Sequence, residues 1–348
     1  MSRRRSDYLY DLPGDQIAHR PAPERDHSRM MVLERSGRRV SHRRFDAIVE
    51  FLKPGDLLVL NDTRVIPARL FGNKEGGGAN VEILLIRALE GNYWKAMVRP
   101  GRRVPVGARI TLQVSGELRI LEKLPDGTRI VELDLPGPLR EYLEAHGNTP
   151  LPPYIPRPPR SEEAFHRARY QTVYARADGS VAAPTAGLHF TPAILEALQA
   201  AGVELATITL HVGPGTFKPV QEEDITRHVM DEEAFRIEPG EAARIEAARR
   251  PGRRIVAVGT TVTRVLEAVA RAHDGRLVAG SGFTDLFIYP GFRFQVLGGL
   301  LTNFHLPGST LLMLVSAFAG REWALENYAA AVSAGYRFYS YGDCMLVL

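Results

Sequence analysis

The chain has 348 residues, of which 45% are hydrophobic and 24% are charged. This composition is ordinary for a globular protein of about two domains and argues against a disordered chain. The formal net charge is +4, from 44 basic and 40 acidic residues, and the single cysteine, Cys344, excludes an internal disulfide and favours a reducing compartment.

The N-terminal segment and the apolar runs predict neither a signal peptide nor a membrane span. Arg3, Arg4 and Arg5 are not followed by an apolar stretch. The longest apolar run, residues 311–319, is far shorter than the roughly 20 residues that a membrane span needs. A cytoplasmic protein without a membrane partner is therefore expected.

Residues 56–60 form the first compact apolar strand, and residues 68–135 then differ from the rest of the chain. Short alternating runs occur there at residues 81–86, 93–98, 109–114, 118–121 and 128–133. Such closely spaced short strands predict a small antiparallel β-barrel. The prolines at positions 150, 152, 153, 156, 158 and 159 then predict a stiff, extended connector back to the first domain.

The remainder of the chain alternates strands and helices. Thr191 and Pro192 predict the N-cap and first residue of a helix that stops at Gly202. Buried strands are expected at residues 203–210 and 254–258, and a third buried strand is expected to end at Leu301. Helices are expected at residues 261–272 and at residues 310–318, the second of them capped by Ser309. The pattern predicts an α/β layered domain with a mixed or mostly parallel sheet, residues 1–66 and 150–348, interrupted by a barrel domain at residues 67–149.

Each buried strand ends in a polar cluster. In open α/β sheets, ligands bind beyond the carboxyl ends of the strands, so parallel strands would bring the clusters together. The residues that follow the strands are Asn61, Asp62, Thr63 and Arg64; His211, Gly213, Gly215 and Thr216; Gly259, Thr260 and Thr261; and Thr302, Asn303 and His305.

Two of these clusters contain glycine loops, which by themselves are weak evidence for a ligand-binding site. Gly259 and the two threonines after it open a helix, where backbone N–H groups can bind an anion or a ribose hydroxyl, although helix capping by Thr261 explains them equally well. The loop at residues 211–216 is not a dinucleotide fingerprint, because Lys218 stands where the third glycine would be. There is no Walker loop and no Cys/His zinc spacing, so no metal site and no retained cofactor are expected.

His189, His211 and His305 are the candidate catalytic residues. For any one of them a structural hydrogen-bonding role is an open alternative. Three imidazoles in three loops that border one crevice favour acid–base chemistry, for which the intrinsic pKa of histidine is suited. The histidines that lack such a context, and are expected at the surface, are His19, His42, His146, His166 and His273.

Arginines gather in local clusters, which are typical of a nucleic-acid partner. A solvated face would give the same pattern. The clusters are Arg38, Arg39, Arg43 and Arg44; Arg99, Arg102 and Arg103; and Arg157, Arg160, Arg167 and Arg169.

Long, uncommon motifs run through nearly the whole chain. They are YDLP at 10–13, GDLLVLNDTRVIPAR at 55–69, LPPYI at 151–155, YQTVYA at 170–175, SVAAPTAGLHFT at 180–191, TLHVGPGTF at 209–217, TDLFIYPG at 284–291, LTNFHLP at 301–307 and YRFYSYGD at 336–343. In these motifs the chain resembles the S-adenosylmethionine:tRNA ribosyltransferase-isomerases of queuosine biosynthesis. The motifs add Thr185, Gly187, Thr284, Asp285, Tyr341 and Asp343 to the expected substrate-binding residues.

The resemblance implies both a fold and a reaction. The fold is an α/β domain with an inserted β-barrel, in agreement with the strand pattern. The reaction transfers the ribosyl group of S-adenosylmethionine, a consumed co-substrate, to 7-aminomethyl-7-deazaguanine at the wobble position of tRNA. Epoxyqueuosine forms, and adenine and methionine are released. A monomer is expected.

One segment departs from the family pattern, which usually reads His-x-Met-His-x-Glu. Here residues 228–233 read HVMDEE, so His228 and Glu233 remain while Asp231 replaces the second histidine. An imidazole or metal ligand required at that position would be missing, but Asp231 can still accept a hydrogen bond or orient His228.

The reaction needs a base for the C5′–H that the sulfonium acidifies and an acid for the departing adenine. If His189 or His305 is the acid or base, alanine there is expected to reduce turnover at least about 100-fold, with folding intact because both are predicted in loops. The groups expected to hold the ribose hydroxyls or the methionine ammonium are the carboxylates of Asp62, Asp285 and Asp343. The methionine carboxylate is expected to bind Arg64, Arg264 or Arg337.

Two rival functions remain. A tRNA methyltransferase would also use S-adenosylmethionine, but its usual glycine-rich loop after the first strand is missing. A non-catalytic RNA-binding module would account for the barrel and the arginines. The His, Asp and Asn residues at the strand ends exceed what phosphate binding requires.

Overall fold

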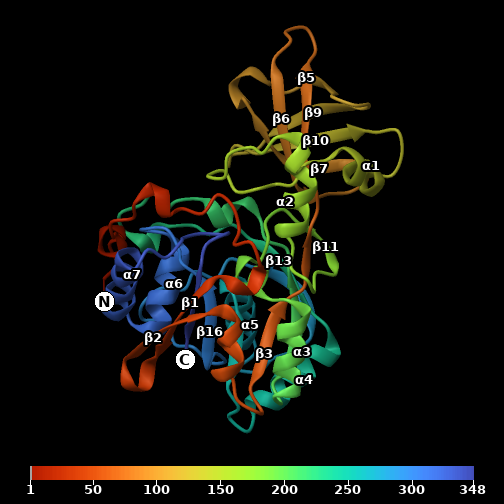
Figure 1. Cartoon of the computed structure of the whole chain (residues 1–348). Coiled ribbons are helices and arrows are strands. Elements are labelled where there is room, and N and C mark those ends of the chain that lie inside the picture. Colours follow the sequence, from red (N-terminus) through yellow and green to blue (C-terminus); the bar gives the residue numbers. More distant parts are fainter. Residues whose placement is uncertain (1) are drawn as a thin grey trace.

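The computed structural model describes residues 2–348 and has two parts, a layered α/β domain and a β-barrel. Figure 1 shows the barrel strands set apart from the larger sheet, with α2 (Glu163–Arg169) and β11 (Ala177–Ser180) between the two parts. Both termini lie in the α/β domain. No helix among residues 2–348 is long and apolar enough to cross a membrane.

The α/β domain contains a nine-stranded sheet in the order β15-β13-β12-β3-β14-β16-β17-β1-β2. Its four neighbouring strands β12, β3, β14 and β16 are parallel, whereas antiparallel pairs occur on both sides of them. The mixed α/β sheet is therefore confirmed. The bounds are β1 (Arg29–Glu34), β2 (Arg39–Arg44), β3 (Leu57–Asn61), β12 (Glu204–Leu210), β13 (Glu233–Ile237), β14 (Ile255–Val258), β15 (Gly280–Thr284), β16 (Gly299–Asn303) and β17 (Cys344–Val347).

Helices cover both faces of this sheet. Successive side chains of a strand point to opposite faces, and Leu57 and Val59 pack in one core while Leu58 and Leu60 pack in another. The first core contains α4 (Pro239–Arg249), α5 (Thr260–Ala272), α6 (Thr310–Ala319) and α7 (Arg321–Ser333), and the second contains α3 (Pro192–Ala200) and the 3-10 helix η5 (Phe45–Glu50).

Local capping sets the helix starts as predicted. The Thr191 side chain accepts a hydrogen bond from the Ile194 N–H at 3.3 Å, and Ser309 caps α6 by accepting from the Leu312 N–H at 3.2 Å. The predicted strands and helices after the connector agree with the structure within about two residues, which is the usual uncertainty of element ends. Strands β1, β2, β13, β15 and β17 were not predicted.

Six antiparallel strands close into the predicted barrel, in the order β10-β7-β6-β5-β8-β9. Its core contains Ile83, Leu85, Ala96, Ile120 and Val131, all fully buried. The strands are β5 (Arg69–Lys74), β6 (Asn80–Ala88), β7 (Tyr93–Arg99), β8 (Arg109–Leu112), β9 (Glu117–Lys123) and β10 (Arg129–Asp134), followed by α1 (Leu139–His146). The expected domain boundaries at 66/67 and 149/150 remain predictions.

The chain crosses between the two parts twice. Strand β4 (Thr63–Val65) leads into the barrel and pairs in parallel with β11, which belongs to the return path. The proline-rich connector is not extended throughout, because it turns where the Ile155 N–H donates to Pro152 O at 3.0 Å. The remaining short 3-10 helices are η1 (Arg5–Tyr8), η2 (Gly14–Gln16), η3 (Arg25–His27), η4 (Arg35–Gly37), η6 (Gly101–Arg103), η7 (Arg160–Glu162), η8 (Thr185–His189), η9 (Pro214–Phe217) and η10 (Ile225–Arg227).

Candidate functional site

A small polar pocket, here called the strand-end pocket, lies beyond the carboxyl ends of β14 and β16. Its volume is about 50 Å³. Seven of the predicted site residues line it, namely Thr185, Thr216, Gly259, Thr260, Thr261, Asn303 and His305. Residues that the sequence reasoning did not include among the site residues also line it, among them Thr302, Phe217, Tyr339 and Ser340. Their positions beside Asn303 and inside the motifs at 209–217 and 336–343 are the signals that could have identified them.

A larger interdomain cleft, of about 450 Å³, lies between the barrel and the α/β domain. It contains His211 and Gly213 of the predicted set, together with Trp94 of the barrel and Phe283 of β15. Val212 lines both this cleft and the strand-end pocket, so the two cavities meet at the segment that follows β12. No local sequence pattern indicates Trp94 or Phe283, because packing between distant segments brings them here.

The remaining predicted residues lie outside both cavities. Most of them brace the strand ends: Asn61 exchanges two 3.0 Å hydrogen bonds with Leu210, and Asp343 accepts from the backbone N–H groups of Arg29 and Arg337 at 2.9 and 2.8 Å. Asp285 is exposed. The predicted site residues that line neither cavity are Asn61, Asp62, Thr63, Arg64, Gly187, His189, Gly215, Thr284, Asp285, Tyr341 and Asp343.

His189 is fully packed and has both ring nitrogens occupied. Its Nδ1 lies 2.6 Å from the Ser28 Oγ and its Nε2 lies 3.2 Å from the Asn303 Nδ2. Burial, assisted by the nearby Arg337 and Arg25, lowers the pKa of His189 to about 3, so the ring is neutral. His189 therefore holds Asn303 in position and lines neither the strand-end pocket nor the interdomain cleft.

Asn303 in turn presents an unused acceptor. Its Nδ2 donates to the Tyr339 carbonyl at 3.2 Å, while its Oδ1 is buried and has no hydrogen-bond partner within residues 2–348. A buried acceptor without a partner costs free energy, and the residue that carries it lines the strand-end pocket.

His305 lines the strand-end pocket but is also buried. Its Nε2 lies 2.8 Å from the Thr302 Oγ1, and its backbone carbonyl accepts from the Tyr10 hydroxyl at 2.5 Å. Burial lowers the pKa of His305 to about 3. The expectation that alanine at His189 or His305 leaves folding intact is therefore corrected, because both side chains are only 5–6% exposed and alanine would leave a cavity.

His211 presents a free ring nitrogen to the interdomain cleft and, unlike His305, is only half-buried. Its Nδ1 lies 2.9 Å from the Thr63 Oγ1, and the Thr63 hydroxyl donates to Ala177 O at 3.5 Å. Nδ1–H therefore donates to Thr63, and this tautomer leaves the Nε2 lone pair open to the cleft. Gly179, with a φ of +143°, permits the close approach, because a Cβ there would lie 2.9 Å from the ring.

The pKa of His211 is lowered, chiefly by burial, but the carboxylates of Asp62 and Asp178 oppose that effect. The ring is only half-buried. His211 is thus the predicted catalytic histidine best suited to exchange a proton with a ligand in the cleft.

A buried ion pair fixes the loop after His211. Glu233 and Arg264 contact each other through their charged ends, and each is 5% exposed. Glu233 also accepts from the Gly213 N–H at 3.0 Å, and Arg264 donates to the carbonyls of Thr284 and Leu286. Arg264 is therefore occupied and does not face a cavity as a carboxylate ligand. The arginines that do line the interdomain cleft are Arg87 and Arg140.

Asp231, which replaces the usual second histidine, belongs to the same loop region. Its carboxylate accepts from the Lys218 Nζ at 2.7 and 2.8 Å and lies directly against Gly215, where no side chain would fit. No hydrogen bond joins Asp231 to His228, whose ring packs on Phe287. The contacts of Asp231 thus hold the loop at residues 213–218.

One of the other histidines was placed wrongly. His166 was expected at the surface but is 2% exposed, and its Nδ1 lies 3.2 Å from the Tyr341 hydroxyl. Its helix α2 lies in the junction between the two parts, and the sequence pattern of a seven-residue helix does not reveal which face is covered.

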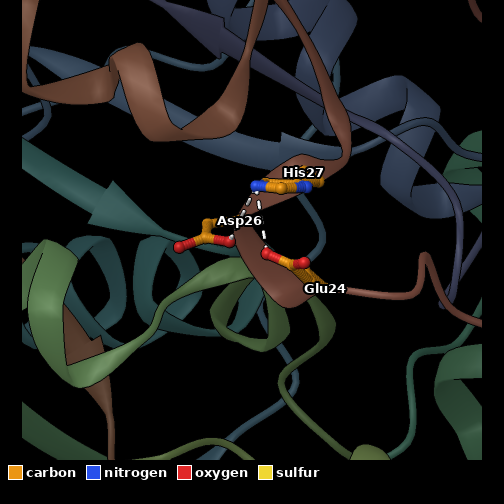
Figure 2. A group of neighbouring side chains, drawn as sticks. All are labelled: Glu24, Asp26 and His27. Carbon is orange, nitrogen blue, oxygen red and sulfur yellow. Dashed lines mark ion pairs between the residues drawn. The ribbon is translucent and has the colours of Figure 1, made fainter.

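Among residues 2–348, one group of side chains is close enough to share a metal ion: Glu24, Asp26 and His27. Figure 2 shows His27 paired with both carboxylates, at 3.1 Å from Glu24 and 4.0 Å from Asp26. The His27 side chain is 40% exposed, and Asp26 also accepts from Thr191 at 3.1 Å. These contacts explain why the three side chains lie close together: they form ion pairs at the surface, next to the N-cap of α3.

We expect activity to survive metal chelators, because no closed set of Cys and His ligands faces either cavity in the described chain. The measurement is turnover before and after dialysis against EDTA. Loss of activity that zinc or iron specifically restores would contradict the expectation.

The comparisons with known proteins agree with the motifs. A family model described as a queuosine biosynthesis protein matches residues 5–347. The S-adenosylmethionine:tRNA ribosyltransferase-isomerase of Moorella thermoacetica is 55% identical and covers 99% of this chain and 100% of its own. The enzyme of the same name from Desulfitobacterium hafniense is 49% identical, and the match covers 98% of this chain and 99% of that one. The crystal structure of an S-adenosylmethionine tRNA ribosyltransferase from Thermotoga maritima has a TM-score of 0.56 and 39% identity, covering 98% of this chain and 100% of that one. The resemblance is confirmed, and the chain belongs to the S-adenosylmethionine:tRNA ribosyltransferase-isomerase family of queuosine biosynthesis, a family of transferases.

Proposed function

We propose that this chain transfers the ribosyl moiety of S-adenosylmethionine to the aminomethyl group of 7-aminomethyl-7-deazaguanine at the tRNA wobble position. The group isomerises to give epoxyqueuosine, and adenine and methionine leave. The similarity to S-adenosylmethionine:tRNA ribosyltransferase-isomerases supports the co-substrate and the tRNA. The observation that carries the chemistry is the free Nε2 of His211 in the interdomain cleft, next to Val212, which lines both cavities.

In this proposal S-adenosylmethionine occupies the interdomain cleft. The volume of about 450 Å³ lies in the range of small-molecule sites, whereas the strand-end pocket of about 50 Å³ is too small for the whole co-substrate. Trp94 and Phe283 offer aromatic faces for the adenine. The Glu232 carboxylate suits the cationic sulfonium or ammonium group, and Arg87, which has no carboxylate partner among residues 2–348, suits the methionine carboxylate. Asp178 and Arg140 also line the cleft but pair with each other at 3.3 Å.

His211 then acts as the base that removes the C5′ proton next to the sulfonium. The strand-end pocket holds the ribose hydroxyls through the Asn303 Oδ1 and the threonines that open α5. His189 and His305 are positioning residues, because burial lowers the pKa of each to about 3 and their rings hydrogen-bond to neighbouring side chains. We further propose a monomeric cytoplasmic enzyme without a retained cofactor.

Isotope placement distinguishes this reaction from methyl transfer. A methyltransferase passes on the methyl carbon, whereas the proposed enzyme leaves ribose carbons on the tRNA and keeps the methyl group in methionine. We expect ribose-labelled co-substrate, and not methyl-labelled co-substrate, to label tRNA that carries the aminomethyl-deazaguanine. The control is tRNA with unmodified guanine, which lacks the nucleophilic amine and should take up neither label. Methyl label in the tRNA would refute the proposal, and absence of both labels would favour a non-catalytic RNA-binding module.

A further inference from the structure

A second cleft between the two parts, here called the connector cleft, has a volume of about 490 Å³. It lies between strands β5, β6 and β7 of the barrel, the proline-rich connector and the loop that follows η9. The half-buried side chains of Leu84 and Met97 contribute apolar surface from the barrel. The proposed reaction does not use this cleft.

The charge along the connector cleft is mostly positive. Arg99 and Arg157 line it, are exposed, and form no ion pair with a carboxylate in the described chain. The Arg157 guanidinium instead lies over the Phe71 ring, 3.7 Å from its centroid. Arg102 and Arg103 in η6 extend this charge beyond Arg99, and they too lack a carboxylate partner among residues 2–348. Glu82, the carboxylate that lines the cleft, is paired with Arg69 at 3.2 Å.

Aromatic rings connect the connector cleft to the strand-end pocket. Phe217 lines both cavities. Its ring centroid lies 6.3 Å from that of Tyr154 and 6.3 Å from that of Tyr339, and the two tyrosine rings are 4.1 Å apart. Tyr339 has a φ of +78°, which is rare for a bulky residue and concentrates at functional sites. A flat group that enters the connector cleft therefore meets stacking surfaces on its way to the ribose-binding threonines.

We propose that the connector cleft binds the single-stranded anticodon loop of the acceptor tRNA, with backbone phosphates on Arg99 and Arg157 and the wobble base at Phe217. This inference rests on the proposed function, since it places the acceptor opposite S-adenosylmethionine across the segment at residues 212–217. Cations that follow a groove, combined with aromatic faces, are the features that bind unpaired nucleotides. S-adenosylmethionine itself carries a cationic sulfonium and is disfavoured among these arginines.

The first test measures tRNA affinity as a function of salt for the double variant Arg99→Glu/Arg157→Glu. Each lost phosphate contact removes counterion release, so the slope of log K against log salt should become less negative by about 1.4, or about 0.7 for each of the two contacts. At about 0.1 M salt the affinity should fall at least about tenfold. The matched control is Arg109→Glu/Arg119→Glu, an exposed cross-strand pair on β8 and β9, on the opposite side of the barrel. A variant with the slope and affinity of the wild type would overturn the inference.

The second test locates the RNA directly. The one cysteine of the chain, Cys344, is fully buried, so a new cysteine is the accessible thiol for a photoreactive label. Met97→Cys in the cleft should crosslink to anticodon-loop nucleotides, and Val40→Cys, exposed on the far edge strand β2, should not. Crosslinks confined to the acceptor stem, or none from Met97→Cys, would contradict the proposal.

The two proposals fail in different ways. An enzyme that crosslinks to the anticodon loop but transfers no ribose label would refute the proposed reaction and support the connector cleft. An enzyme that transfers the label and retains wild-type tRNA affinity after Arg99→Glu/Arg157→Glu would support the reaction and refute the cleft.

Discussion

His211→Asn should reduce the turnover number of ribose transfer at least about 100-fold, the usual lower limit for loss of a general acid or base. The asparagine amide can still donate to the Thr63 Oγ1, which His211 contacts at 2.9 Å, but the Nε2 lone pair in the interdomain cleft is lost. Binding of S-adenosylmethionine should change little, because the effect lies in the chemical step. The measurement is single-turnover release of adenine.

The pH dependence gives a second readout of the same substitution. Burial lowers the pKa of His211 from its ordinary value of 6.5, and a base acts in its neutral form. Activity of the wild type should therefore fall as pH drops through a value below 6.5, and this acid limb should be absent from His211→Asn. His273→Asn, at an exposed histidine just after α5, is the matched control and should keep both activity and pH profile. Turnover of His211→Asn within a few-fold of the wild type would move the acid–base role to another residue.

Glu233→Ala should lower the free energy of unfolding by about 3–5 kcal/mol, because it leaves the Arg264 charge buried without its partner. Arg264 is 5% exposed, and its hydrogen bonds to two carbonyls do not replace a negative charge. The Gly213 N–H also loses its 3.0 Å acceptor, which should loosen the loop after His211. Urea unfolding followed by circular dichroism measures the change.

An exposed ion pair in the same loop region provides the control. Lys218 and Asp231 are 50% and 43% exposed, so Asp231→Ala should cost at most about 1 kcal/mol. The double variant Glu233→Met/Arg264→Met removes both buried charges and should recover part of the loss. A destabilisation of Glu233→Ala no larger than that of Asp231→Ala would show that the buried pair contributes little.

The sequence by itself determined the elements whose signals are local. Thr191 and Ser309 act as N-caps through their own side chains, and the apolar runs at residues 56–60 and 254–258 form strands within about a residue of the prediction. Because β12, β3, β14 and β16 are parallel, their polar ends meet at one edge, as the pattern indicated. The family followed from motifs spread along the chain.

Only the tertiary structure decided which of these polar residues face a cavity. His189, His211 and His305 look equivalent in sequence, yet burial lowers the pKa of His189 and His305 to about 3, whereas His211 is half-buried and keeps its Nε2 free in the interdomain cleft. Trp94 and Phe283 reach the interdomain cleft because the barrel docks against the edge strands. Burial and hydrogen-bond partners are set by residues far away in the chain, and a side chain's pKa and its access to a ligand depend on those partners, so a local pattern of residue types cannot supply them.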